Sequence, residues 1–193
     1  MINKAYIELI EQLEKFYPPL STGFKIRLPK KLFEMNYKKG VRILNYKEVQ
    51  DCFLFIYKGS AMELSVDQKT LEEVACNFWF KKDFPYTTPG LFSKELSPSY
   101  IKLLADTHLV GIIFTDLMAM KGEFPEIEPL TENIRSHYAR LKLEMENDFR
   151  YPAVHRVMRL ELEHPNIYNI AEIQHIAQYH RISMETLRRL RSR

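Results

Sequence analysis

The sequence predicts an α+β fold in which an N-terminal antiparallel β-roll of the jelly-roll type is followed by helices. Three observations support this prediction. Short β-branched and aromatic runs separated by turn residues fill about residues 24–114, an apolar stripe at helical spacing covers residues 127–149, and two short helical patterns joined by a brief turn follow at 170–191. Because the predicted strands follow one another without intervening helices, a sandwich or barrel is favoured over a sheet of βαβ units.

The composition is that of a soluble globular protein. The chain has 193 residues, of which 46% are hydrophobic and 27% are charged, enough for one large domain or two small ones. Cys52 and Cys76 are too few for a disulfide framework or a four-thiolate cluster, so we expect a reducing, cytoplasmic location. We expect no signal peptide and no transmembrane helix, since the longest apolar runs fall far short of the ~20 residues that cross a bilayer.

The N-terminal part is expected to contain one helix and then strands. Residues 1–17 have the spacing of an amphipathic helix that ends at Pro18 and Pro19. An irregular stretch marked by Pro85, Pro89 and Gly90 interrupts the strands; it predicts a short helix at about residues 91–96 and a place for a pocket. The predicted strands are FKIRL, VRILNY, CFLFIYKG, AMELSVD, LEEVACNFWF and HLVGIIF.

The apolar stripe of residues 127–149 predicts a long helix that needs a partner. Its charged neighbours are typical of the solvated face of a two-stranded coiled coil, which favours dimerisation. The alternative is that the stripe packs on the β-domain of its own chain. Tyr151 and Pro152 then break the helix and mark a domain boundary. The residues predicted to form the dimer contact are Leu130, Ile134, Tyr138, Leu141 and Met145.

Positive charge is concentrated in two regions of the chain. Residues 23–47 hold eight Lys or Arg against the single acid Glu34, and residues 151–193 hold seven Arg and no Lys against four Glu. Arginine is the residue suited to bidentate contacts with phosphate and guanine. The C-terminal region is therefore the first candidate for a nucleic-acid contact.

Residues 173–193 fit the template of a helix-turn-helix. Ala177 is the small residue expected where the two helices approach most closely, and Ser183 can cap the second helix. A solvated arginine-rich tail is the simpler alternative, but it would not require apolar residues at fixed spacing. The positions expected to lock the helices together are Ile176, Ile182, Leu187 and Leu190.

The motif IAQYHRISMETLRRLR resembles the C-terminal helix-turn-helix of the Crp/Fnr family of bacterial transcription regulators. CFLFIYKGSAMELSVD resembles the strand-glycine-strand of that family's cyclic-nucleotide-binding-like β-roll, and KKDFPYTTPGLFSKELSPSYIKLLADTHLVGI resembles the segment that spans its pocket. The long apolar stripe lies where the family has its dimerisation helix, so the resemblance covers nearly the whole chain in the right order. It implies a sensory β-roll at 1–118, a dimerisation helix at 119–150 and a DNA-binding domain at 151–193.

The resemblance also implies which residues contact double-stranded DNA. An arginine can bind guanine or phosphate, and a glutamate can accept from the N4 amine of cytosine. Arg181 stands where the family usually has a turn glycine, which predicts either strain or a turn of a different shape, and we expect the β-wing of many members to be absent. The implied base and phosphate contacts are Ser183, Met184, Glu185, Arg188, Arg189 and Arg191.

The implied effector pocket departs from the family. Tyr86-Thr87-Thr88 and Ser97-Pro98-Ser99 replace the acidic and arginine motifs that hold a cyclic nucleotide, so we expect no ordinary cAMP or cGMP binding. Two cysteines exclude an iron-sulfur cluster of the Fnr kind. Histidines leave haem open, but we predict no metal site and no cofactor. The residues expected to line the pocket are Phe84, Tyr86, Thr87, Thr88, Ser97 and Ser99.

The sequence contains no catalytic constellation, so an enzyme is not expected. There is no Gly-rich phosphate loop, HExxH motif or nucleophile elbow, and residues 1–107 lack histidine, which argues against a cupin-like enzyme. We expect a homodimeric regulator that binds DNA, responds to an unidentified small effector and contacts RNA polymerase. A ligand-sensing or protein-interaction module whose helix-turn-helix no longer binds DNA is the alternative left open.

Overall fold

Two antiparallel sheets form the β-roll, as the sequence predicts. The computed structural model describes residues 3–67 and 72–192. One sheet has the order β1-β7-β3 and the other β2-β6-β4-β5. Their side chains meet in an apolar layer that includes Leu54, Ile56, Trp79 and Ile101. The strands are β1 (Phe33–Tyr37), β2 (Arg42–Leu44), β3 (Cys52–Lys58), β4 (Ala61–Val66), β5 (Glu73–Trp79), β6 (Ser99–Leu103) and β7 (Thr107–Ile113).

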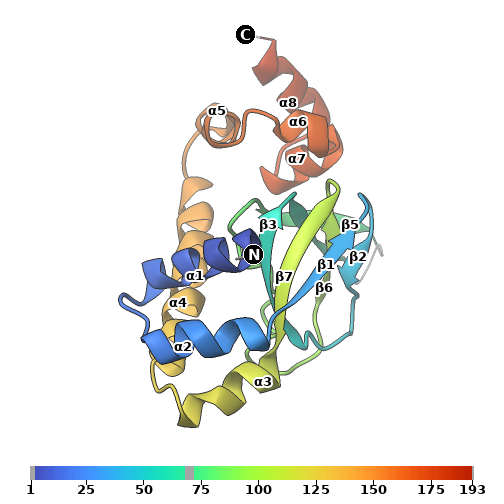
Figure 1. Cartoon of the computed structure of the whole chain (residues 1–193). Coiled ribbons are helices and arrows are strands. Elements are labelled where there is room, and N and C mark those ends of the chain that lie inside the picture. Colours follow the sequence, from blue (N-terminus) through green and yellow to red (C-terminus); the bar gives the residue numbers. More distant parts are fainter. Residues whose placement is uncertain (1–2, 68–71, 193) are drawn as a thin grey trace.

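Helices cover the roll on two sides (Figure 1). The helices α1 (Lys4–Phe16), α2 (Thr22–Arg27), α3 (Phe114–Ala119) and α4 (Ile127–Asp148) enclose the outer face of the β1-β7-β3 sheet. Short 3₁₀ turns, η1 (Leu28–Lys30) and η2 (Met120–Gly122), follow α2 and α3. The remaining helices, α5 (Ala153–Glu163), α6 (Ile167–Ile170), α7 (Ile173–Tyr179) and α8 (Met184–Arg191), lie against the other sheet.

Local capping explains where the first helices begin. The side chain of Asn3 accepts from the amides of Ala5 and Tyr6 at the start of α1, and Ser21 accepts from the amide of Phe24 at the start of α2. Ala5 and Leu9 repeat at four-residue spacing and are buried, which turns one face of α1 toward the sheet. These caps supply acceptors for amides that have no partner within the helix.

Two local predictions are wrong. The run FKIRL was expected as a strand, but Phe24 and Leu28 are buried on the helical segment α2–η1, where the Ser21 cap and the preceding prolines set the chain direction. The short helix expected at residues 91–96 is a series of turns, with Gly90 and Lys94 at positive φ. β1 and β6 are strands that the pattern did not predict.

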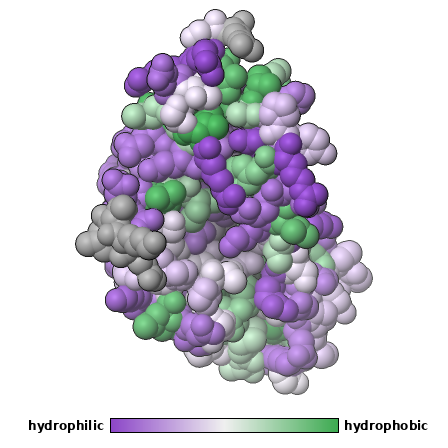
Figure 2. All heavy atoms as spheres, turned by 180° about the vertical axis from the view of Figure 1, so that it is seen from behind, coloured by the Kyte–Doolittle hydropathy of each residue, from purple (hydrophilic) through white to green (hydrophobic). Residues whose placement is uncertain are grey.

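The C-terminal helices do not have a core separate from the roll. One buried apolar cluster joins the outer face of the β2-β6-β4-β5 sheet to these helices. It contains Met62, Leu64 and Phe78 of the sheet together with Ile176 and Leu187. Residues 151–193, which we expected to form a DNA-binding domain, are therefore packed on the roll through a continuous apolar layer. Figure 2 shows one face of the molecule, where hydrophilic side chains are interspersed with small apolar groups. Among the described residues, no helix is both long and apolar enough to cross a membrane.

Candidate nucleic-acid interface

The helices α7 and α8 are joined by a short turn at the place of the predicted helix-turn-helix. Ile176, Ala177 and Leu187 are buried, and Ile182 and Leu190 pack against them. These are the apolar positions that the sequence predicted. The amide of Ile182 donates to the carbonyl of Ala177, which closes the turn between the helices. This pairing holds α8 at a fixed angle to α7.

Ser183 caps α8, as the sequence predicted. Its Oγ accepts from the amide of Thr186 at 3.1 Å and donates to the Oγ1 of Thr186 at 2.9 Å. This hydroxyl therefore donates one hydrogen bond and accepts another at the start of the helix. Its role in the structure is to cap α8, which begins at Met184. The capping box that a glutamate would complete is replaced by a hydroxyl pair.

Arg181 adopts the positive φ that its glycine-like position requires, with φ +54°. Its guanidinium lies 3.9 Å from the ring centroid of Phe149 and pairs with Glu146 at 2.5 Å. Arg156 also faces the ring of Phe149, at 4.9 Å, and donates to the carbonyl of His180 at 3.0 Å. The turn of the helix-turn-helix is therefore attached to the last turn of α4 by contacts that offset the backbone strain.

Five of the implied contact residues are exposed on α8, and four of them have no aromatic or acidic neighbour that holds them in the described part of the chain. Met184, Glu185, Arg188 and Arg189 all lie on its solvent face. Arg191 differs, because its guanidinium lies 3.6 Å from the ring centroid of Tyr168 and 3.8 Å from Glu161. Its first contribution is therefore to hold α8 against the neighbouring helices.

A small polar pocket lies behind the helix-turn-helix. Residues of α4, α5 and the end of α7 line it, among them Asp148, Arg156, Arg159 and His180. His180 is buried, and burial together with the two arginines lowers its pKa to about 4. His180 is therefore neutral near pH 7. Within the described part of the chain, no three His, Cys, Asp or Glu residues are placed to hold a metal ion.

Inside the β-roll the structure brings Ser97 and Ser99 together with a residue that sequence reasoning missed. The Oγ of Ser97 donates to the carbonyl of Ser99 at 2.6 Å, and the Oγ of Ser99 donates to the carboxylate of Glu63 at 2.5 Å. Glu63 shares the inward face of β4 with Ala61, so burial raises the pKa of its carboxyl group. Burial raises the pKa of Tyr86 to about 12, and the nearby carboxylate of Glu63 adds to this shift.

Alternation along AMELSV was the available signal for Glu63. It separates Ala61, Glu63 and Ser65 from Met62 and Leu64, and a polar face is normally assigned to solvent. Here the apolar face of β4 is covered by the C-terminal helices, so the polar face is the one that points inward. One strand could not reveal which face another element covers.

The other predicted pocket residues lie elsewhere. Phe84 is in the core beneath α1, stacked on Phe53 with centroids 4.9 Å apart. Thr87 is buried and its amide donates to Gln50, whereas Thr88 is exposed.

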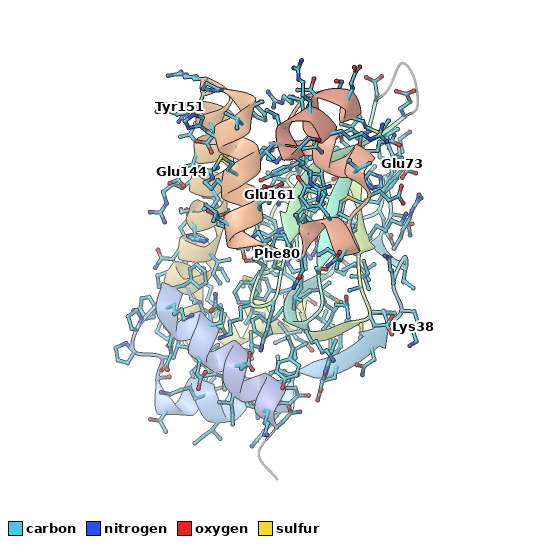
Figure 3. The ribbon with its side chains drawn as sticks, turned by 90° about the horizontal axis from the view of Figure 1, so that it is seen from above. Lys38, Glu73, Phe80, Glu144, Tyr151 and Glu161 are labelled. Atoms are coloured by element: carbon cyan, nitrogen blue, oxygen red, sulfur yellow. The ribbon has the colours of Figure 1, made fainter. Side chains whose placement is uncertain are left out.

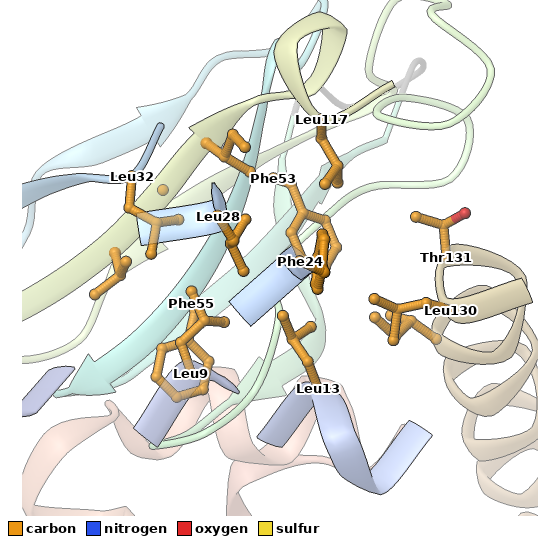
Figure 4. A pocket seen from close by; sticks show the side chains of 14 residues that line it. Leu9, Leu13, Phe24, Leu28, Leu32, Phe53, Phe55, Leu117, Leu130 and Thr131 are labelled. Atoms are coloured by element: carbon orange, nitrogen blue, oxygen red, sulfur yellow. The ribbon is translucent and has the colours of Figure 1, made fainter. Parts of the chain in front are cut away.

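A separate apolar cavity lies between α1, the β1-β7-β3 sheet and α4 (Figure 4). Leu13, Phe55 and Leu130 are among the side chains that line it. Its volume is about 20 Å³, which is room for one water-sized molecule. An effector the size of a nucleotide would not fit there.

The long helix α4 packs on its own roll along the first part of the stripe, which holds three of the residues predicted to form a dimer contact. Leu130 and Ile134 are buried against α1 and the sheet. The hydroxyl of Tyr138 accepts from the amide of Phe84 at 2.8 Å and donates to Asp83 at 3.2 Å. These three side chains are already used within the chain, which is the alternative that the stripe left open. Of the two remaining predicted contacts, Leu141 is exposed and Met145 lines the polar pocket.

Comparisons with known proteins support the architecture. No protein-family model and no curated protein matches the sequence. Among solved structures, FixK2 from Bradyrhizobium japonicum is similar with a TM-score of 0.70 at 17% identity, covering 83% of each chain. The chain has the fold of the Crp/Fnr regulators. A proposed Crp/Fnr-family transcriptional regulator from Eubacterium rectale also gives a TM-score of 0.70 at 17% identity, over 92% of this chain and 86% of that one.

The same fold is found in a protein named as a catabolite activator. The catabolite activator protein of Thermus thermophilus matches with a TM-score of 0.54 at 14% identity, over 92% of this chain and 84% of that one. At these identities the likeness concerns the fold, which bears out the predicted α+β architecture of β-roll, long helix and C-terminal helices. The neighbours are regulators and cyclic-nucleotide-binding proteins rather than enzymes.

Proposed function

We propose that this chain is a sequence-specific DNA-binding transcription regulator of the Crp/Fnr type. The observation that carries the proposal is the exposed face of α8. Arg188 and Arg189 lie on this face, and neither guanidinium has a carboxylate partner in the described part of the chain. A helix that presents free arginines and is held by a buried apolar face matches the geometry of a recognition helix in a major groove.

Residues at the start of α8 supply the base-reading groups in this proposal. Glu185 lies in the first turn, where its carboxylate can accept from the N4 amine of cytosine. Met184 is 41% exposed and offers an apolar contact to a thymine methyl group. Arg188 and Arg189 then contact guanine or the phosphate backbone, whose charge supplies much of the affinity.

The protein acts as a dimer, and the outward face of α4 is the proposed contact. Leu143 is 62% exposed on this face, on the opposite side of the helix from the buried Leu130 and Ile134. A C₂ pair along α4 would place two copies of α8 on a palindromic site. Replacing Leu143 with Glu should lower the dimer fraction in sedimentation velocity, and replacing the buried Ile134 with Val should not.

The effector, if one binds in the roll, differs from cAMP. Where a cyclic phosphate needs a cation, Ser97 and Ser99 lead instead to the carboxylate of Glu63. A phosphate placed there would meet a second negative group in a buried setting, which costs several kcal/mol. Titration calorimetry with cAMP should give no heat of binding; replacing Glu63 with Gln removes the charge and should not by itself restore binding.

The direct test is selection of duplexes from a randomised library, followed by affinity measurements at two salt concentrations. We expect enrichment of a two-fold-symmetric sequence whose binding is lost in an Arg188→Ala/Arg189→Ala variant. An Arg27→Ala/Lys30→Ala variant is the matched control, because it removes the same charge from the exposed surface of α2 and η1. Failure of the protein to select any sequence would favour the protein-interaction module.

A further inference from the structure

The edge of the β2-β6-β4-β5 sheet is closed by a side chain of the helix-turn-helix. β5 is the outer strand of this sheet and pairs with β4 on one side only. The carbonyl of Glu73 and the amide of Ala75, two residues apart, face the same free edge. An edge strand offers such groups to any neighbour that can complete the ladder.

Gln178 of α7 supplies both missing partners. Its Nε2 donates to the carbonyl of Glu73 at 3.1 Å, and its Oε1 accepts from the amide of Ala75 at 3.1 Å. One carboxamide thus makes the two hydrogen bonds that a residue of a further strand would make. Glutamine is suited to this position because its single amide carries a donor and an acceptor side by side.

Two aromatic contacts extend the attachment along the same strand and the turn after it. Phe78 packs against Tyr179 with centroids 5.0 Å apart, and Phe80 stacks on His164 at 3.3 Å. In the view from above (Figure 3), Glu73 lies beside the C-terminal helices and Phe80 near the end of α5. β5 therefore contacts the helices next to α8 near both of its ends.

We propose that Gln178 is a positioning residue for DNA recognition, which fixes the helix-turn-helix against β5 so that α8 is carried rigidly by the β-roll. The DNA part of this inference rests on the proposed function. The exposed face of α8 is left open in this docked arrangement. Docking therefore pre-orders the recognition helix, and binding costs less orientational entropy than it would for a mobile domain.

The other face of β5 points into the roll, so an effector bound inside the roll could act on the helix-turn-helix through this strand. Trp79 lies on the side that faces the interior of the roll, and the thiol of Cys76 donates to the carbonyl of Glu63 at 3.5 Å. A ligand that shifts β5 from inside would move the carbonyl and amide that Gln178 holds from outside. The sensory and DNA-binding parts are then coupled through one strand.

A Gln178→Met variant tests the proposal, since methionine keeps the length of the side chain and removes both hydrogen bonds. In the free protein, we expect the Ala75 amide to exchange its hydrogen about tenfold faster, as loss of one hydrogen bond predicts. Gln174→Met is the matched control for exchange and for thermal stability, because Gln174 is exposed on the same helix.

The second measurement is affinity for the duplex selected by the wild-type protein and for a scrambled duplex of equal length. We expect Gln178→Met to weaken binding to the selected duplex about fivefold or more while affinity for the scrambled one stays constant, because the loss is one of orientation and not of charge. Equal loss on both duplexes would indicate general destabilisation and would overturn the positioning role.

The two parts of the inference fail in different ways. Unchanged exchange at Ala75 would overturn the contact itself, whether or not DNA binds. Faster exchange with unchanged or tighter binding to the selected duplex would overturn the positioning role. If the wild-type protein selects no duplex, the proposed function fails, and the exchange data still decide whether Gln178 holds β5.

Discussion

Replacing Tyr138 with Phe would test whether α4 is anchored within its own chain. The substitution removes one hydroxyl and leaves the ring packed on Tyr86, at a centroid distance of 5.6 Å. The amide of Phe84 loses its acceptor and Asp83 loses a donor. A half-buried or buried polar group left without its partner costs about 1–3 kcal/mol, so the two losses together predict about 2–6 kcal/mol.

The assay is urea denaturation at two protein concentrations, with Tyr151→Phe as the control. Tyr151 is 62% exposed, so its hydroxyl should contribute little. The free energy of unfolding should fall by about 2–6 kcal/mol in the variant. In a thermal melt, where 1 kcal/mol shifts Tm by about 2–4 °C for a chain of this size, the variant should lose at least about 4 °C. The difference between variant and wild type should be the same at both concentrations.

The pH dependence gives the same prediction a second readout. Burial raises the pKa of Asp83 to about 6, so this group favours folding at low pH, and its contribution is lost as pH rises through about 6. The Tyr138 hydroxyl favours the ionised form, so its removal should cost more at pH 7.5 than at pH 5. A concentration-dependent loss, or no loss at pH 7.5, would mean that Tyr138 contacts a partner, as the sequence pattern suggested.

Three further predictions follow from single positions. Gly59→Ala should cost about 3 kcal/mol in urea denaturation, because Gly59 has φ +106° and a Cβ would lie 2.3 Å from the Oγ1 of Thr107, whereas Gly122→Ala should be neutral. Arg181→Gly should change stability by less than about 1 kcal/mol, since relief of the positive φ offsets the lost ion pair and ring contact, and a larger loss would mean that the backbone is unstrained. The pKa of His180 is lowered to about 4, so its neutral form stabilises the fold above about pH 6.5, and up to about 3 kcal/mol of stability is lost as the pH falls toward 4. Protection factors of the amides in α7 and α8 that stay constant over this range would contradict the prediction.

The sequence predicted the elements whose signals are local. The apolar positions of the helix-turn-helix, the cap at Ser183 and the positive φ of Arg181 depend on spacing and backbone sterics within a few residues. The strand-rich region and the long helix have periodicities that extend over many residues. Such patterns need no knowledge of distant contacts.

The sequence could not decide between partners where two faces of one element compete for them. The stripe on α4 has the spacing of a dimer seam, but the same spacing serves packing on a sheet, and Leu130 and Ile134 are buried there. For β4, the presence of helices on its apolar face turned Glu63 inward. The helical conformation around Phe24 depended on Ser21 and on the prolines before it, which outweighed the β-branched and aromatic composition of FKIRL.

The apolar layer shared by the roll and the C-terminal helices restricts how this protein can be divided or rearranged. Separation of the helix-turn-helix would expose Met62 and Leu64 on one side and Ile176 and Leu187 on the other to water. A fragment ending near residue 150 would therefore expose the apolar outer face of the β2-β6-β4-β5 sheet. A protease acting at the α4–α5 junction would yield two aggregation-prone fragments instead of two independent domains. In the proposed dimer, each subunit would then move as one block, and a change in DNA binding would correspond to a changed spacing between two whole subunits.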